Sequence, residues 1–395
     1  MTETPVTTET PAQPGYSLWH IVRYMLALGT WGFGGPVALV GYMYRDLVEK
    51  RHWISESEYK EGMALAQLMP GPLAAQLAIY LGYVHHRVLG ATLVGMAFVL
   101  PSFLMVVAIG AAYAAYGGIA WMQAVFYGVG AAVIGIIAMS AYKLTTKNIG
   151  KDKLLWAIFA VSAAVTVITK SEIVWIFLGA GVLVWLLRAP PKWLADNTVN
   201  GVAAPIVAFF AIDALDWHKL GQIAAYFAYA GSFVFGSGLA IVPFLYGGVV
   251  HEYQWLNERQ FVDAVAVAMI TPGPVVITTG FIGYLVSGFW GAVVAAAGTF
   301  IPCYLFTILP APYFKKHGKR PGIVAFVDGV TAAAIGAITG AVIVIGQRSI
   351  TDLATAALAL ITVGVLWRFR KVPEPVVVAI AAIAGLVLFP LTKHA

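Results

Sequence analysis

The stretch Gln67-Leu68-Met69-Pro70-Gly71-Pro72 returns 202 residues later as Met269-Ile270-Thr271-Pro272-Gly273-Pro274. At the same offset, Phe33-Gly34 corresponds to Phe235-Gly236. One single-residue deletion then reduces the offset to 201, and further equivalent positions are Gly90 with Gly291, Pro101 with Pro302, Gly128 with Gly329, and Gly135 with Gly336. Self-similarity that preserves the helix-breaking residues indicates an internal duplication.

The composition assigns both halves to the membrane. Hydrophobic residues make up 60% of the chain, charged residues 11%, and the mean hydropathy is +0.84, whereas a soluble domain carries about 25% charged residues. Neither Leu89–Tyr142 nor Ala264–Phe314 contains an Asp, Glu, Lys, Arg or His. A helical span needs about 20 apolar residues, so each stretch holds at least two. The sequence therefore predicts an all-α polytopic membrane protein.

Charge and motifs exclude several function classes. The net charge is +6, but Lys and Arg cluster between apolar runs, which indicates membrane orientation and no nucleic-acid partner. The one cysteine, Cys303, excludes a disulfide framework or a thiolate metal cage. The P-loop pattern of ATP hydrolysis and the HExxH and GxSxG patterns of hydrolytic enzymes are missing. We interpret His85-His86 as part of a short loop and not as a metal site. We expect no enzyme activity, cofactor or metal. If the protein is a transporter, we expect an ion gradient, the membrane potential or exchange to drive it.

The apolar segments give the domain boundaries. Residues 1–16 are rich in Thr, Pro and Glu and are predicted to be a disordered tail. The first repeat covers 17–188 and the second covers 219–391, each with six apolar segments. The linker, 189–218, contains the short apolar stretch Gly201–Ile212, which we expect at the membrane interface.

Basic loops indicate that the two repeats are inverted. In the first half, the loop at Tyr116–Gly118 has no charge and the next, Lys143–Lys153, is rich in lysine. In the second half the order is reversed: Lys315–Arg320 is basic, and the next loop has only Arg348 against Asp352. Because short cytoplasmic loops are enriched in Lys and Arg, corresponding loops are expected on opposite sides of the membrane.

Inversion in one chain requires an odd number of crossings per half, although six segments are present. Pro-Gly-Pro interrupts the second segment of each half, and such breaks are tolerated at membrane depth only when protein or water surrounds them. We therefore expect five crossings and one re-entrant hairpin per half, ten crossings in total, with both termini in the periplasm. The alternative is that the second segment spans and that 201–215 crosses as well.

Interrupted helices near the pseudo-symmetry axis are where inverted-repeat transporters bind their substrates. A helix that restarts after Pro-Gly-Pro has free N–H groups and about half a positive charge at its N-terminus, which suits an anion. Small residues also serve helix packing alone. The predicted substrate-binding residues are Gly32, Phe33, Gly34, Gly35, Pro36, Pro70, Gly71, Pro72, Gln76, Phe235, Gly236, Ser237, Gly238, Thr271, Pro272, Gly273, Pro274, Thr278 and Arg23.

Charged residues near these breaks have two interpretations each. Arg23 in the first segment is a candidate for the anion, or its side chain snorkels to the interface. Asp328, Glu58 and Glu61 are candidates for proton coupling, since acids in membrane segments are costly and often functional. The alternatives are a helix cap for Asp328 and a solvated amphipathic helix for Glu58 and Glu61.

The sequence resembles the chromate transporter (CHR) family of bacterial membrane proteins, in its long two-domain form. The resemblance rests on Trp31–Pro36 and Gln67–Pro72, with a weaker second copy in Phe235–Gly238 and Thr271–Val275. It implies a secondary transporter that exports chromate across the inner membrane and confers chromate resistance. The second copy departs from the first where Met269 replaces Gln67 and Ser237-Gly238 replaces Gly35-Pro36, so the two halves are expected to contact the anion unequally.

These inferences predict an inverted-repeat transporter that moves chromate outward by alternating access. Sulfate is an isosteric dianion, so the alternatives are a sulfate or other oxyanion permease and a passive anion channel. An intramembrane enzyme or a lipid-handling protein is disfavoured because no catalytic cluster is present. The expected partners are chromate, sulfate as a competitor and the lipid bilayer, and a homodimer fits this class of architecture.

Overall fold

The computed structural model describes residues 15–33, 35–116, 120–169, 173–190, 217–236, 238, 241–317, 320–350, 352–369, 372 and 374–392. The predicted site residues Gly34 and Ser237 lie outside these ranges. So do nearly all of the predicted tail and the whole of Gly201–Ile212.

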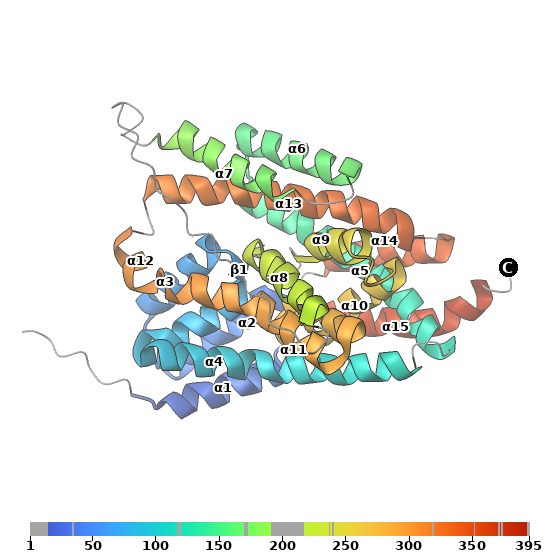
Figure 1. Ribbon diagram of the computed structural model, residues 1–395, viewed down its shortest axis with the longest axis horizontal. Helices are drawn as coiled ribbons and strands as arrows, with labels where there is room; N and C mark the ends of the chain where they lie inside the picture. Colours follow the sequence, from blue (N-terminus) through green and yellow to red (C-terminus); the bar gives the residue numbers. More distant parts are fainter. Residues whose placement is uncertain are drawn as a thin grey trace, which may run out of the picture.

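Helices account for almost all of the described chain (Figure 1). The first half contains α1 (Leu18–Trp31), α2 (Gly35–Met43), η1 (Tyr44–Lys50), α3 (Glu56–Leu68), β1 (Gly71–Pro72), α4 (Leu73–Tyr116), α5 (Ala120–Asn148), α6 (Lys153–Thr169) and α7 (Val174–Arg188). The second half contains α8 (Trp217–Ser232), β2 (Phe235–Gly236), α9 (Ile241–Leu245), η4 (Tyr246–Glu252), α10 (Glu258–Ile270), η5 (Val275–Ile277), α11 (Thr278–Ile308), α12 (Ala311–His317), α13 (Pro321–Ser349), α14 (Leu353–Arg368) and α15 (Glu374–Thr392).

The first apolar segment folds back on itself. The sequence predicts one crossing over 17–44, whereas the structure forms two antiparallel helical arms, α1 and α2–η1. Tyr24 near the middle of α1 donates to Asp46 at 3.4 Å, and the rings of Tyr16 and Trp53, at the two ends of the stretch, stack with centroids 5.0 Å apart. The reason is local: Gly32 has extended backbone at φ −81° and ψ 92°, which ends α1.

The second segment forms another helical hairpin, between α3 and the first part of α4. Its two arms are joined at their ends, where Glu58 lies 3.1 Å from His85, and in the middle, where Gly62 leaves room for the Tyr80 ring. Arg87 has φ 52° and ψ −144°, so α4 consists of two helices that meet there. The long part from Val88 to Tyr116 leads away from the hairpin.

The second half repeats both hairpins with the same backbone irregularities. Non-glycine residues with positive φ occur at the equivalent positions His52 (φ 51°) and Gln254 (φ 50°). The kink at Arg87 has its equivalent at Gly288, with φ 61° and ψ −153°. Repeats that share such unfavourable backbone geometry share a fold in detail, as the sequence duplication predicts.

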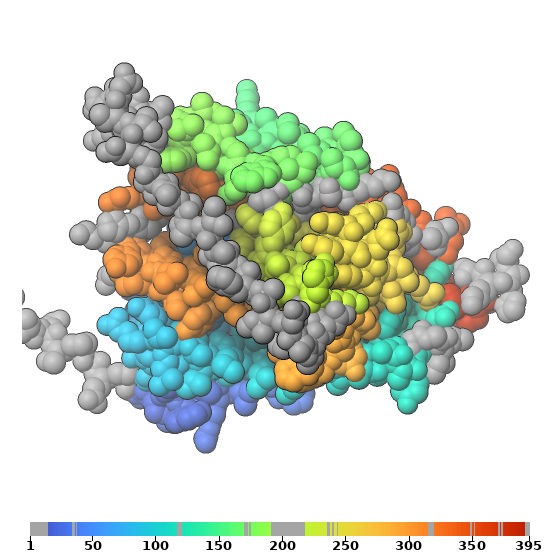
Figure 2. All heavy atoms as spheres, in the orientation of Figure 1, coloured from blue at the N-terminus to red at the C-terminus, as the bar shows by residue number. Residues whose placement is uncertain are grey.

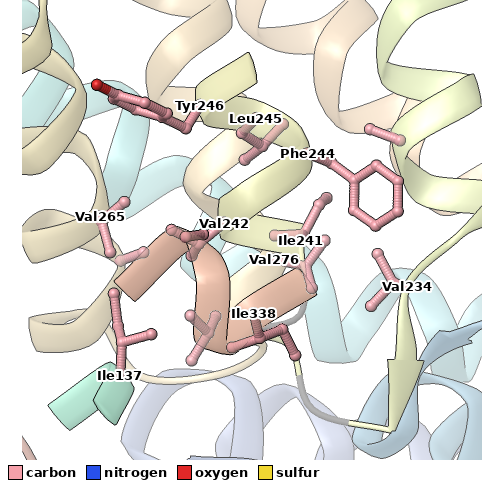
Figure 3. Packing of buried hydrophobic residues seen from close by; sticks show 14 of the residues in the cluster. Ile137, Val234, Ile241, Val242, Phe244, Leu245, Tyr246, Val265, Val276 and Ile338 are labelled. Atoms are coloured by element: carbon pink, nitrogen blue, oxygen red, sulfur yellow. The ribbon is translucent and has the colours of Figure 1, made fainter. Parts of the chain in front are cut away.

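The long helices of the two halves are interleaved. α13 packs against α6 and α7 of the first half, and α5 packs against α14 and α15 of the second. In Figure 2, the second-half helices (yellow and orange) lie between α6–α7 (green) and α1–α4 (blue). The core near the centre is apolar, and the equivalent residues Ile137 and Ile338 contribute to it from α5 and α13 (Figure 3). Both halves are therefore needed to complete one core.

Two ends of the molecule are distinguished by their polar contacts. At the end that we call the basic face, Arg188 donates to Asp328 at 2.9 Å and also pairs with Asp152 in the lysine-rich loop. At the opposite face, the Tyr127 hydroxyl donates to Asp352 at 2.7 Å, and the Tyr127 ring lies 5.4 Å from that of Phe389. Each face thus combines loops that are not equivalent in the two repeats, as inverted repeats require.

The hairpins of the two halves open toward different faces. α12 precedes α13 at the basic face, contacts α3, and contributes Phe314 to the same buried cluster as Tyr16. The first-half hairpins therefore open at the basic face. In the second half, the kink at Gly288 lies 20 residues, about 30 Å of helix, from the end of α11 beside α12. The second-half hairpins open at the opposite face.

This arrangement differs from the expectation that both termini share one side. Tyr16 lies at the basic face, whereas α15 ends at the opposite face beside Tyr127 (right in Figure 1). The first segment contributes to this placement, because α1 and α2–η1 fold back on each other at Gly32.

Five helical stretches within the described ranges are long and apolar enough to cross a membrane: Leu73–Tyr116, Trp121–Asn148, Val275–Phe314, Pro321–Gln347 and Glu374–Leu391. Three shorter apolar helices accompany them, Lys153–Thr169, Trp175–Arg188 and Leu353–Arg368. The protein is a multi-pass, all-α membrane protein.

Candidate functional site

The four predicted helix breaks meet at the centre of the molecule, in a region that we call the crossing point. Here β1 and β2 pair in parallel, with Gly71 opposite Phe235 and Pro72 opposite Gly236. The reciprocal contact is a hydrogen bond of 3.0 Å from the Gly273 N–H to the Gly32 carbonyl. Each Pro-Gly-Pro turn therefore bonds the glycine-rich break of the other half.

Glycine is required at the two turns for conformation and for space. Gly71 has φ 142° and Gly273 has φ 94°, where side chains with a Cβ are strained. A Cβ on Gly273 would also collide with the Ser102 hydroxyl, which donates to the Pro272 carbonyl at 2.7 Å. Ser102 thus fastens the second turn to α4 of the first half, a role that the sequence did not indicate.

The equivalent residues Gln76 and Thr278 lie in the first turns after the two Pro-Gly-Pro motifs. Both are fully buried. Gln76 Nε2 donates to the Pro70 carbonyl at 2.7 Å, and the Thr278 hydroxyl donates to the Val275 carbonyl at 2.8 Å. Gln76 Oε1 has no hydrogen-bond partner among the residues that the structure describes. Both side chains hold a turn, and Gln76 keeps one acceptor at the crossing point.

The other predicted residues of the second half line the same region. Thr271 is buried and donates to the Val267 carbonyl at 2.7 Å, which closes the end of α10. Gly238 is buried, and a Cβ there would lie 3.3 Å from Val275. Gly238 thus lets the break pack closely against the second turn.

The side chains beside the two Pro-Gly-Pro turns differ in exposure. On the first-half side, Gln67 is exposed, as are Trp31 (77%) and Phe33 (37%), while Pro36 and Pro70 are half-buried. The equivalent of Gln67, Met269, is only 4% exposed. Exposure beside the two turns therefore differs at this pair of equivalent residues, although Ile270 next to the second turn is 40% exposed.

Four charged candidates lie away from the crossing point. Arg23 is exposed on α1, more than two turns before the break. Asp328 is ion-paired with Arg188 at the basic face. Glu58 accepts from the Ser55 N–H and hydroxyl at the start of α3, and Glu61 lies close to Tyr80 within the hairpin.

A cavity of about 570 Å³ lies at the basic face, beside the first-half hairpins. Glu58 lines it together with His85, whose Nδ1 lies 2.9 Å from the Tyr16 hydroxyl. No group of three or more His, Cys, Asp or Glu side chains within the described ranges is arranged to hold a metal ion.

Sequence reasoning missed one buried acid, Asp263 in α10, which is 3% exposed. The Tyr113 hydroxyl on α4 donates to Asp263 Oδ2 at 2.6 Å. The repeat register contained a signal for it, because at the offset of 202 Asp263 is equivalent to Glu61, which the sequence did select.

Comparison with known proteins agrees with this architecture. The family model described as chromate transporter matches the chain twice, over residues 19–185 and 221–386. The chain is 70% identical to the chromate transport protein of Cupriavidus metallidurans, over 96% of each chain. It is 62% identical to the probable chromate transport protein of Synechococcus elongatus, over 95% of this chain and 97% of the relative.

More distant relatives extend the likeness. The chain is 30% identical to the chromate transport protein of Pseudomonas aeruginosa, over 98% of this chain and 96% of the relative. No solved structure matches. With both halves matched by the same family model, and with the motifs of both halves joined at one crossing point, the chain belongs to the chromate transporter family.

Proposed function

We propose that this protein exports chromate from the cytoplasm across the bacterial inner membrane as a secondary transporter. The observation that carries the proposal is the reciprocal bonding at the crossing point, Gly71 with Phe235 and Gly273 with Gly32. The names of the relatives supply the substrate, and the geometry supplies a place for an anion between two restarted helices.

The anion site is built mainly from backbone. α4 begins directly after Pro72, and η5 with α11 begins after Pro274. Each start presents N–H groups and about half a positive charge, and a low-dielectric surrounding strengthens this attraction. Two such starts together offset much of the charge of a tetrahedral dianion without a buried Arg or Lys. Sulfate has the same charge and shape, so it should compete at this site.

The pseudo-symmetry supplies alternating access. We infer that the first-half side is the accessible one in this state, because Gln67 is exposed and its equivalent Met269 is buried. Exchange of these two conformations between the repeats would close the first-half side and open the other. Because the basic face is cytoplasmic by the positive-inside rule, the state described here is the one that receives chromate from the cytoplasm.

We further propose that each half has two re-entrant hairpins and four full crossings, in place of one hairpin and five crossings. The fold-back of α1 on α2–η1 supports this, as does the opening of the first-half hairpins at the basic face.

Cysteine labelling tests this topology. In a Cys303→Ser background, Glu56→Cys should react with an impermeant maleimide only from the cytoplasmic side, as Lys151→Cys does. Glu252→Cys should react only from the periplasm, because the second-half hairpins open there. Labelling of Glu56→Cys from the periplasm in intact cells would contradict the arrangement.

Radiolabelled chromate flux in everted membrane vesicles tests the function. We expect gradient-dependent uptake that excess sulfate reduces and that the double variant Pro72→Ala, Pro274→Ala loses, because both helix starts lose their fixed geometry. Absence of flux above empty vesicles, with intact protein present, would remove chromate as the substrate. Flux that equilibrates but never accumulates under any gradient would indicate a passive channel.

A further inference from the structure

We propose that Asp263 is the proton-binding residue that couples chromate export to a proton gradient, with Tyr113 as its gating partner. This inference rests on the proposed function. It assigns the coupling role to a residue outside the three acids that the sequence suggested.

Asp263 is placed between the opposite face and the crossing point. It lies in the middle of α10, the helix that begins near the opposite face and ends at Thr271, directly before Pro272-Gly273-Pro274. A displacement of this hairpin therefore moves the acid and the second-half turn together. A residue whose protonation is linked to chromate release at the periplasm is expected on a helix, such as α10, that moves together with the substrate-binding turn.

The surroundings of Asp263 disfavour a permanent carboxylate. Its side chain is 3% exposed, and Tyr113 is a neutral donor at 2.6 Å. A buried charge in a membrane protein costs several kcal/mol unless it is paired. A carboxyl that carries a proton while it is sealed avoids this cost.

Among the residues that the structure describes, the charged and titratable groups near Asp263 do not form an ion pair with it that would fix it as a carboxylate. The two that act on it are Tyr113 from α4 and Arg259 on its own helix, and the Arg259 side chain is exposed. From the packed elements, η4 directs the Tyr246 hydroxyl to Glu258 at 3.5 Å, and α11 places Tyr284 against Gly110. The acids of α13 and α15 lie at the basic face, where Asp328 pairs with Arg188 and Glu374 lies near Lys143.

The hydrogen bond to Tyr113 joins the two halves. Tyr113 belongs to the spanning part of α4 and is held by edge contacts with Phe126 on α5 (5.5 Å) and Phe281 on α11 (5.6 Å). Opening of the second-half hairpin separates Asp263 from this fixed hydroxyl and exposes the carboxylate to the periplasm. The carboxylate then binds one proton from the periplasm, and its neutral form returns to Tyr113 as the hairpin closes. The carboxyl gives this proton up to the cytoplasmic side while chromate binds at the crossing point, so that one proton enters for each chromate exported.

The equivalent acid, Glu61, has a different environment. It also lies close to a tyrosine, Tyr80, but Glu61 is partly exposed and Tyr80 belongs to the same hairpin. This contact therefore does not connect two elements that move apart. This contrast favours Asp263 over Glu61 as the residue whose protonation is linked to the transport cycle.

The test separates exchange from coupled accumulation in everted vesicles. Wild type should exchange radiolabelled chromate without a gradient and accumulate it when the lumen is acidified; one pH unit coupled to one proton supports about a tenfold accumulation. Asp263→Asn, which cannot release a proton, should keep exchange within about twofold and lose accumulation. Chromate-induced proton efflux, followed with a pH-sensitive dye, should disappear in the same variant.

Three further variants guard against a folding artefact. Asp263→Glu keeps a titratable group and should restore part of the accumulation. Tyr113→Phe should shift the pH profile of exchange. Tyr127→Phe removes another Tyr–Asp hydrogen bond between the halves, of 2.7 Å, and should behave as wild type.

The outcomes are distinguishable from failure of the proposed function. Wild type without exchange or accumulation would overturn the function itself. Normal accumulation in Asp263→Asn would overturn the coupling role alone. Loss of accumulation in Glu61→Gln, with Asp263→Asn unaffected, would also overturn it and would assign the role to the first half.

Discussion

Replacement of Gly273 by alanine is expected to reduce chromate transport by at least roughly 100-fold. The positive φ of 94° costs a non-glycine residue about 1–2 kcal/mol. The new Cβ collides with Ser102, which endangers the Ser102–Pro272 and Gly273–Gly32 hydrogen bonds, at about 1 kcal/mol each. Together these costs correspond to two or more factors of ten in the population of the intact crossing point. Vesicle flux at matched protein level measures the effect.

Two variants separate the causes of this loss. Gly288→Ala introduces a side chain at φ 61° with no heavy atom within 4 Å, at a kink away from the crossing point, and should keep most of the flux. Adding Ser102→Ala to Gly273→Ala removes the collision but leaves the strain, so it should recover part of the flux. Wild-type transport by Gly273→Ala would show that the crossing point is not part of the transport site.

Replacement of Gly128 by leucine is expected to destabilise the whole molecule. Gly128 on α5 approaches Gly385 and the Ala381 carbonyl on α15 so closely that even a Cβ would collide. Interfaces between membrane helices depend on such small residues, and overpacking costs about 1–3 kcal/mol or more. We expect the melting temperature in detergent to fall by about 5–10 °C, measured by size-exclusion chromatography after heating.

The matched control for this prediction is Gly364→Leu on α14. Gly364 is exposed and has no heavy atom within 4 Å of its added Cβ. It should therefore retain the wild-type melting temperature. Equal destabilisation by both variants would mean that leucine itself, and not the α5–α15 contact, is responsible.

The architecture could be read from the sequence because its signals are local. The duplication is visible from the register of Gly and Pro residues such as Pro70-Gly71-Pro72 and Pro272-Gly273-Pro274. The opposite placement of equivalent loops followed from Lys and Arg alone, and the ion pair of Arg188 with Asp328 unites the expected loops on one face. Neither inference needs knowledge of which helix contacts which.

The course of the first segment could not be read in the same way. Residues 17–44 are mostly apolar, whether they cross the membrane or fold back at Gly32. Hydropathy is the same in both cases, and only the contact of Tyr16 with Trp53 decides between them. The predicted position of the N-terminal end depends on the same ambiguity.

The sequence by itself determined that the chain is an all-α membrane protein built from two repeats, and it predicted four helix breaks and an inverted relation between the repeats. Tertiary structure alone decided that each break bonds the opposite half, as Gly71 does with Phe235, and that Tyr113 reaches Asp263. Hydrophobic periodicity, helix-breaking Gly and Pro residues, and charge predict the local structure of a segment. These contacts, in contrast, join residues more than 100 positions apart. Their partners are chosen by the packing of interleaved helices, which no single segment encodes.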